Sequence, residues 1–127
     1  SALDVAQQEA LKSILAGETH PQRRFELDWA ITGLEDKINP KQVDVSKLAH
    51  YAGSYGERSI KSEDGQLYYR RGENPWALLV PMSERLFRLE AVDYFRLEII
   101  VGADGNPSEL VGHYDNGTED RSQRSSP

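Results

Sequence analysis

Cysteine is absent from this chain, and histidine occurs only three times. The lack of cysteine excludes disulfide bonds, thiolate nucleophiles and sulfur-rich zinc sites. A zinc site built on His20, His50 or His113 would have to recruit carboxylates from unlinked segments of the chain. We therefore expect neither a metal nor another cofactor.

Long apolar runs and an excess of positive charge are also missing. No stretch approaches the ~20 apolar residues that span a bilayer, and no basic start followed by an apolar run marks a signal peptide. The formal net charge of -6 disfavours nucleic acid and anionic membranes as partners, because such binding depends mainly on Lys and Arg. Since the chain begins at Ser1 rather than at methionine, we expect it to belong to a longer protein.

What the chain does contain is typical of one folded domain with a small helical segment in front of it. Its 127 residues are 38% hydrophobic and 28% charged. Residues 3–16 have apolar side chains at helical spacing. A second helix is expected to begin at the capping-box spacing of Thr19 and Gln22 and to end at the Asn-Pro pair after Ile38. The two helices predict a helical hairpin over 1–40.

After this hairpin the spacing of the apolar residues changes from helical to alternating. In YFRLEIIV, residues 94–101, Phe95 and Leu97 fall on one face while Tyr94 and Arg96 fall on the other. Short turn sequences such as EDG, ADGNP and DNG separate such runs and leave no room for crossover helices. The prediction is an α+β fold: the hairpin, then an antiparallel meander of six or seven strands over 41–117, curled or partly barrel-like. A disordered tail is expected over 118–127, because TEDRSQRSSP has no apolar residue.

The segment GADGNPSELVGHYDNG, residues 102–117, gathers acidic residues, glycines and a histidine and is a candidate for metal binding or catalysis. From Asp104 the spacing begins like a calcium loop, but Glu109 stands where such a loop needs glycine, so two hairpin turns are favoured. AGSYG around Ser54 resembles a nucleophile elbow, yet alanine replaces its first glycine and no helix follows. No catalytic residue is assigned, and we expect the chain not to be an enzyme.

Exposed aromatic side chains remain the best candidates for contact with a ligand or partner. Strands favour aromatic residues for packing alone, so a packing role stays open beside the binding role. The candidate contact residues are Trp29, Tyr68, Trp76, Tyr94 and His113.

The order of helices, turn glycines and strand aromatics resembles a known family. Over about residues 3–120 the chain is similar to the C-terminal extension of bacterial tail-specific serine peptidases, those related to C-terminal-processing and retinoid-binding-protein-like proteases. It is also similar to the C-terminal β domains of β-lactamase-like serine hydrolases. The residues that carry the likeness are Tyr51, Gly53, Tyr55, Gly56, Gly65, Leu67, Tyr68, Gly112, Tyr114 and Gly117.

This resemblance implies a non-catalytic accessory domain of a periplasmic or extracellular peptidase. The catalytic serine and lysine of that family lie in a separate upstream domain, so no catalytic residue carries over to this chain. The implied partners are the upstream peptidase domain and a substrate polypeptide. Two other readings stay open: a lipocalin-like module that holds an apolar ligand or peptide, and a pure interaction domain that docks through Phe25 and Trp29.

Overall fold

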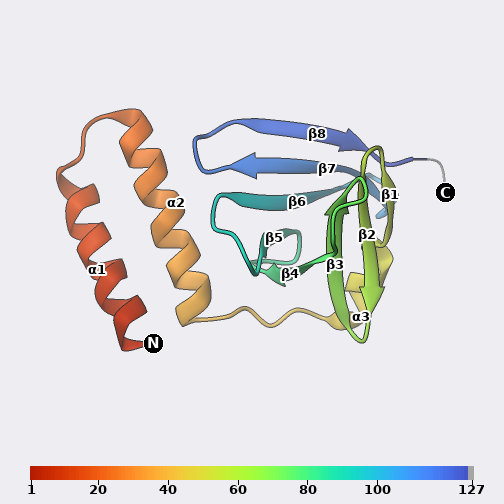
Figure 1. Cartoon of the computed structure of the whole chain (residues 1–127), viewed down its shortest axis with the longest axis horizontal. Helices are drawn as coiled ribbons and strands as arrows, with labels where there is room; N and C mark the ends of the chain where they lie inside the picture. The colour runs from red at the N-terminus through yellow and green to blue at the C-terminus, as the bar shows by residue number, and fades with distance from the viewer. Residues whose placement is uncertain (126–127) are drawn as a thin grey trace.

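A computed structural model describes residues 1–125 and places a helical hairpin beside a curled antiparallel sheet (Figure 1). The predicted α+β class is confirmed, with eight strands rather than six or seven. The hairpin is formed by α1 (Ala2–Gly17) and α2 (Pro21–Ile38), and a connector leads to the short α3 (Val45–Leu48) and a 3-10 turn (Ala49–Tyr51). The strands are β1 (Gly53–Tyr55), β2 (Arg58–Glu63), β3 (Gln66–Arg71), β4 (Ala77–Pro81), β5 (Leu86–Leu89), β6 (Phe95–Val101), β7 (Pro107–Tyr114) and β8 (Glu119–Gln123).

Local capping sets the limits of the two long helices. The Ser1 hydroxyl accepts a hydrogen bond from the backbone nitrogen of Asp4 and so begins α1. The helix α2 begins differently from the prediction, because His20 and not Thr19 is its cap: the ring nitrogen Nδ1 of His20 accepts from Gln22 N at 3.2 Å. The predicted end of α2 at Ile38 is confirmed. Neither long helix, nor any other helix within residues 1–125, is long and apolar enough to cross a membrane.

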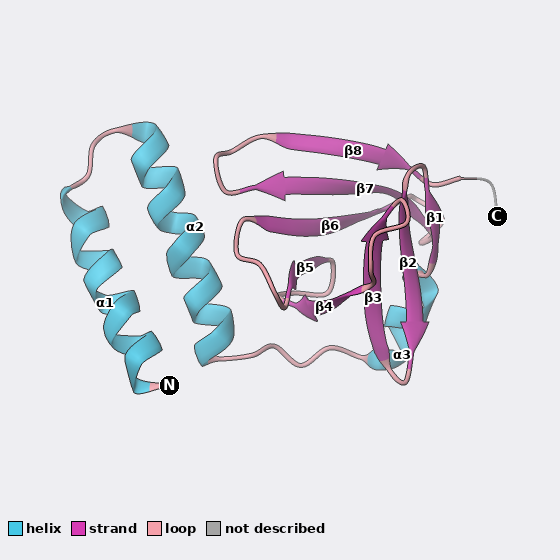
Figure 2. Ribbon diagram, in the orientation of Figure 1, coloured by secondary structure: helices cyan, strands magenta, loops and turns pink. Residues whose placement is uncertain are grey.

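The strands follow one another in chain order, so the sheet is a simple meander (Figure 2). Tight turns join them, and Gly105 and Gly117 take φ values of 81° and 94° there, a region that favours glycine. The sheet curls until its two ends approach each other. Beyond β8, Ser125 N donates a hydrogen bond of 2.9 Å to Ser54 O on β1, so the sheet is nearly a closed barrel.

The prediction of a disordered tail was wrong for the residues that form β8. This strand pairs with β7, and the partners include Gly112 with Asp120. Its inward positions carry Asp120 and Ser122, which hydrogen-bond to the side chain of Arg58 inside the barrel. A strand with no apolar residue is stable here because its polar side chains accept the hydrogen bonds of the buried Arg58 guanidinium. Residues 126–127 of the predicted tail lie outside the described residues.

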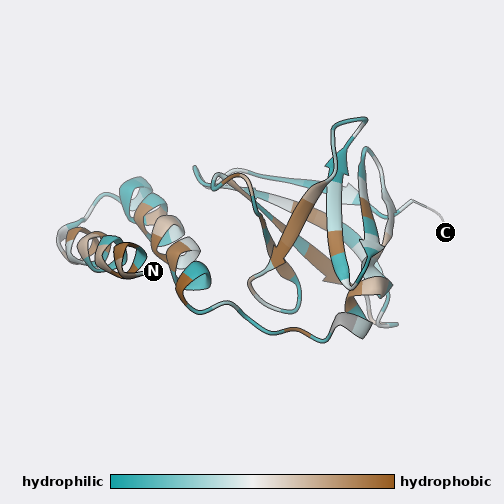
Figure 3. Cartoon of the chain, turned by 60° about the horizontal axis from the view of Figure 1, so that its bottom comes forward, coloured by the Kyte–Doolittle hydropathy of each residue, from teal (hydrophilic) through white to brown (hydrophobic). Residues whose placement is uncertain are grey.

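Apolar side chains fill most of the barrel interior. The alternation predicted for residues 94–101 is confirmed, since Phe95, Leu97 and Ile99 are buried. In Figure 3 hydrophobic segments alternate with hydrophilic ones along the strands, as expected when one face of each strand points inward. The core cluster is Leu48, Tyr51, Tyr55, Ile60, Leu67, Tyr69, Leu79, Phe87, Phe95, Leu97, Ile99 and Leu110.

Candidate functional site

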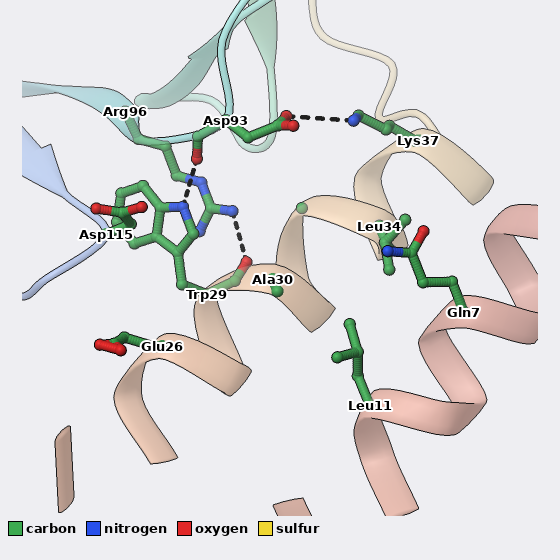
Figure 4. A pocket seen from close by; sticks show the side chains of 11 residues that line it. Gln7, Leu11, Glu26, Trp29, Ala30, Leu34, Lys37, Asp93, Arg96 and Asp115 are labelled. Atoms are coloured by element: carbon green, nitrogen blue, oxygen red, sulfur yellow. Dashed lines mark hydrogen bonds and ion pairs between the residues drawn. The ribbon is translucent and has the colours of Figure 1, made fainter. Parts of the chain in front are cut away.

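Trp29 is the central contact between the helical hairpin and the barrel. Its indole Nε1 donates a hydrogen bond to the backbone oxygen of Asp93 at 2.6 Å. The Arg96 guanidinium lies over the indole ring, with Cζ 3.9 Å from the ring centroid, and its Nη2 donates to Trp29 O at 2.7 Å. Stacking of a cation on an indole strengthens when water is excluded. These contacts hold α2 against the beginning of β6 (Figure 4).

A buried ion pair extends this junction along α2. Arg88 on β5 has its Nε 2.7 Å from Oδ2 of Asp36, and Asp36 is only 3% exposed. Gly33 lies between these contacts, and a Cβ at that position would be 2.9 Å from Nη2 of Arg96. The missing side chain at Gly33 therefore lets α2 approach the barrel closely.

Arg96 is a second buried cation at the same junction. Burial lowers the pKa of Arg96 to about 10, although the negative charges of Asp36 and Asp93 favour its charged form. At neutral pH the guanidinium stays protonated, because this pKa is still well above 7. The hairpin and barrel are thus joined mainly by charged and aromatic groups rather than by a shared apolar core.

A cavity of about 340 Å³ opens beside Trp29, between the hairpin and the barrel (Figure 4). One wall is apolar and comes from Leu11, Ala30 and Leu34 on the two helices. Charged side chains line the rest, including Lys37, whose Nζ lies 3.2 Å from Oδ1 of Asp93. Within residues 1–125 no group of three or more His, Cys, Asp and Glu side chains could hold a metal ion.

His113 lies on the outer surface of β7 between two carboxylates. Its Nε2 is 2.8 Å from Oε1 of Glu98, and its Nδ1 is 3.1 Å from Oε2 of Glu119. With Trp29 it lines a second cavity of about 370 Å³. Both ring nitrogens are thereby occupied by protein groups, which favours a positioning role for this histidine over metal ligation.

One end of the barrel has an aromatic floor. Tyr69 stacks on Phe95 with ring centroids 5.6 Å apart, and Tyr114 meets Phe95 edge-on at 5.3 Å. The guanidinium of Arg58 lies behind this floor, with Cζ 5.9 Å from the Phe95 centroid. These aromatic rings close the interior at the end where β3 and β7 finish and β6 begins.

Arg58 is almost fully buried, with 1% of its surface exposed, and each guanidinium nitrogen has a partner. Nε donates to the Tyr69 hydroxyl and Nη1 to the Ser122 hydroxyl, both at 3.0 Å, while Nη2 contacts the Asp120 carboxylate. Asp120 also accepts from the Tyr114 hydroxyl at 3.1 Å. Burial alone would raise the pKa of Asp120, but the hydrogen bond and charge of Arg58 outweigh it and lower that pKa.

A hollow of about 250 Å³ lies on the outer side of the aromatic floor, at the same end of the barrel. Tyr94 lines this hollow while remaining 55% exposed. The side chains around it come from the ends of β3, β5 and β7 and from the beginnings of β4 and β6. We call this feature the mouth pocket; its lining is Tyr69, Arg70, Arg71, Asn74, Pro75, Ala77, Leu89, Tyr94, Phe95 and Tyr114.

Tyr68 and Trp76 lie together elsewhere, on the outer surface of the sheet. Nζ of Lys61 is 5.4 Å from the Tyr68 ring centroid and 4.9 Å from that of Trp76. Cζ of Arg70 is 4.4 Å from the Trp76 centroid. Neither aromatic lines the mouth pocket or the two cavities beside Trp29.

The outward surface of α1 carries an uncovered apolar stripe. Leu3 is 82% exposed and Ile14 is 56% exposed, and Ala6 and Ala10 lie between them at helical spacing. Other side chains of α1 turn toward α2; Gln8, for example, donates from Nε2 to Ile31 O at 3.3 Å. The side chains of this stripe therefore take no part in the packing of α1 against α2. We refer to Leu3, Ala6, Ala10 and Ile14 as the α1 stripe.

The five aromatic and histidine residues singled out from sequence thus fall in three places. Trp29 and His113 share one cavity, Tyr68 and Trp76 share the outer surface, and Tyr94 stands at the mouth pocket. Sequence reasoning missed the buried charges Asp36, Arg58 and Arg96. For Arg58 the available signal was its alternation with Ile60, which places a cation on the inward side of a strand.

Comparison with known proteins identified no relative. No protein-family model matches the chain, and neither does any curated protein or solved structure. The resemblance to peptidase accessory domains therefore stays a prediction.

Proposed function

We propose that this chain is a non-catalytic accessory module that binds another folded protein domain through α1. The observation that carries the proposal is the α1 stripe, in which Leu3 and Ile14 expose 82% and 56% of their surface. Large apolar side chains aligned on one helix face are costly to leave in water and are typical of interaction sites. The stripe spans several turns of α1, so it offers a partner a continuous surface.

The junction at Trp29 supports this role by giving the stripe a defined orientation. Stacking of Arg96 on Trp29 and the buried pair of Arg88 with Asp36 hold the hairpin on the barrel. A partner bound to α1 would therefore also be oriented relative to the barrel. This is the property expected of a domain that positions a neighbour.

The proposed partner is the catalytic domain of a secreted or periplasmic serine peptidase, encoded upstream in the same polypeptide. The support for this identity is the resemblance carried by turn glycines and strand aromatics, which include Gly53, Tyr55 and Gly112. In this role the module would stabilise or position the peptidase domain, or contact its substrate polypeptide.

The alternative function, a lipocalin-like module that binds an apolar ligand inside the barrel, has less support. Core side chains such as Phe87, Leu97 and Leu110 are fully buried and fill the space that such a ligand would need. Small barrels whose interiors are filled by side chains keep only their rims for binding.

The test begins with the coding sequence that precedes Ser1. If it encodes a peptidase domain, that domain and this chain are made as separate polypeptides and their association is measured by isothermal titration calorimetry. We expect the double variant Leu3→Asp, Ile14→Asp to weaken association at least ~10-fold, since it removes two apolar contacts and buries charge. Val5→Asp is the matched control, because Val5 is an exposed apolar residue on another side of α1.

Three results would contradict the proposal. An upstream frame without any peptidase domain would remove the proposed partner. Equal weakening by Val5→Asp and by the double variant would show that charge on α1, rather than the stripe, controls association. Peptide hydrolysis by the purified chain that disappears in Ser54→Ala would contradict the non-catalytic assignment.

A further inference from the structure

The mouth pocket combines an apolar planar floor with an open side. Tyr69, Phe95 and Tyr114 form the floor, with ring centroids 5.3 to 5.6 Å apart. Leu89 and Ala77 add aliphatic walls. Tyr94 lies at the rim and is 55% exposed, so much of its ring surface is in contact with water. A ligand with a flat apolar body would cover these groups.

The charged side chains that line the mouth pocket are both cationic, and carboxylates of Glu57 and Asp120 lie beside Arg71. Among the described residues that line it there are two arginines and no carboxylate, whereas the whole chain has a net charge of -6. The Arg70 guanidinium stacks on Trp76 at the outer surface of the sheet, with Cζ 4.4 Å from the ring centroid. Arg71 is therefore the cation that a ligand in the mouth pocket can reach.

Arg71 is the more accessible of the two cations. Its contacts with Glu57 and Asp120 are long, 3.4 and 3.5 Å, compared with the ~2.7–2.9 Å of strong charge-assisted hydrogen bonds. Its side chain is 48% exposed. The guanidinium can therefore turn toward a ligand carboxylate without breaking a strong ion pair. Asn74 supplies an additional polar group on the adjoining loop.

We infer that the mouth pocket binds a small molecule with a planar apolar body and a carboxylate. The volume of about 250 Å³ is below the ~300–1,000 Å³ of sites for drug-sized ligands, which limits the ligand to about one aromatic ring with its acid group. The ring packs on Phe95 and Tyr94, and the carboxylate lies at Arg71. This site is independent of the α1 stripe, which lies on the hairpin.

The experiment uses benzoate as the probe and the whole chain as the protein. In ¹H–¹⁵N correlation spectra, titration should shift the amides of Arg71, Ala77 and Phe95 and leave those of α1 unchanged. We expect a Kd on the order of 1 mM for so small a ligand. Benzylamine, which has the same ring with the opposite charge, should bind at least ~10-fold more weakly.

Variants locate the interaction. Arg71→Gln and Tyr94→Ala should each raise the Kd for benzoate roughly 5- to 10-fold, because each removes one of the two recognised features and both residues are exposed enough to leave the fold intact. The matched controls are Arg23→Gln on α2 and Tyr68→Ala on the outer surface of the sheet. Equal binding of benzoate and benzylamine, unshifted amides at the mouth pocket, or equal effects of the controls would each overturn the inference.

Discussion

Arg58 shows how one residue can tie the barrel together from inside. A buried guanidinium without partners would oppose folding, but this one has a hydroxyl, a second hydroxyl and a carboxylate as acceptors. Two of the three acceptors, Asp120 and Ser122, come from β8. The cation therefore connects the second strand of the meander to the last.

Removing the Asp120 carboxylate should show how much the stability of the fold depends on its contact with Arg58. We expect Asp120→Asn to lower the free energy of unfolding by about 2 kcal/mol, because it leaves a buried cation without its counter-charge while an amide oxygen can still accept a hydrogen bond. Urea unfolding followed by circular dichroism measures the change. Asp28→Asn, on the exposed surface of α2, is the control and should change the value by less than ~0.5 kcal/mol.

The contribution of the Arg58–Asp120 pair to the free energy of unfolding should decrease at acid pH. Since the pKa of Asp120 is lowered in the folded chain from its ordinary value of 3.8, its ionisation stabilises the fold above pH 3.8. That contribution is lost as the pH falls through the folded pKa. We therefore expect the difference in unfolding free energy between the unmodified chain and Asp120→Asn to shrink between about pH 5 and pH 2. A difference that stayed constant over this range would show that the pair does not control acid stability.

Much of the residue pattern could be predicted from sequence, but the burial of Arg96 could not. The inward positions of Phe95, Leu97 and Ile99 follow from alternation alone. The same rule placed Arg96 outward, which is correct, yet that side chain is 7% exposed because α2 covers it. Alternation assigns a side to each residue of a strand and carries no information about what packs on that side.

At the scale of elements, β7 and β8 fit together because Gly112 has no side chain. A Cβ at Gly112 would lie 2.5 Å from Oδ1 of Asp120 and 2.9 Å from Cε1 of Phe95. We expect Gly112→Ala to destabilise the fold by about 2 kcal/mol through this overpacking, which lowers the Tm by roughly 10 °C. Gly17→Ala is the matched control, since nothing lies within 4 Å of its added Cβ. Differential scanning calorimetry distinguishes the two variants, and equal Tm values would contradict the expected crowding.

The strand β8 marks the limit of sequence reasoning about elements. Its residues EDRSQ lack the apolar alternation that identified the other strands, so the tail was assigned to disorder. Its partners are set by long-range pairing with β7 and by Arg58, far away in the chain. Helix limits were easier, because caps and turn residues act over a few positions; even so, the cap of α2 moved from Thr19 to His20.

For the whole molecule, the contact at Trp29 decides whether hairpin and barrel act as one body. We expect Trp29→Ala to release the hairpin while both parts stay folded, because the indole supplies the stack with Arg96 and the hydrogen bond to Asp93. Small-angle X-ray scattering should then show a larger radius of gyration with unchanged helix content. Trp76→Ala, on the outer surface of the barrel, is the control and should leave the radius of gyration unchanged. Unchanged scattering from the Trp29 variant would mean that the other junction contacts suffice.

The buried pair of Arg58 and Asp120 also has a consequence in time. These residues are 62 positions apart, so at a synthesis rate of ~5–20 residues per second Arg58 is added to the chain roughly 3–12 s before Asp120. During that interval the cation must remain in water, and the first strands cannot adopt their final curvature around it. We therefore expect barrel closure to be the last step of folding during synthesis. It must wait until β8, a strand with no apolar residue, has been made.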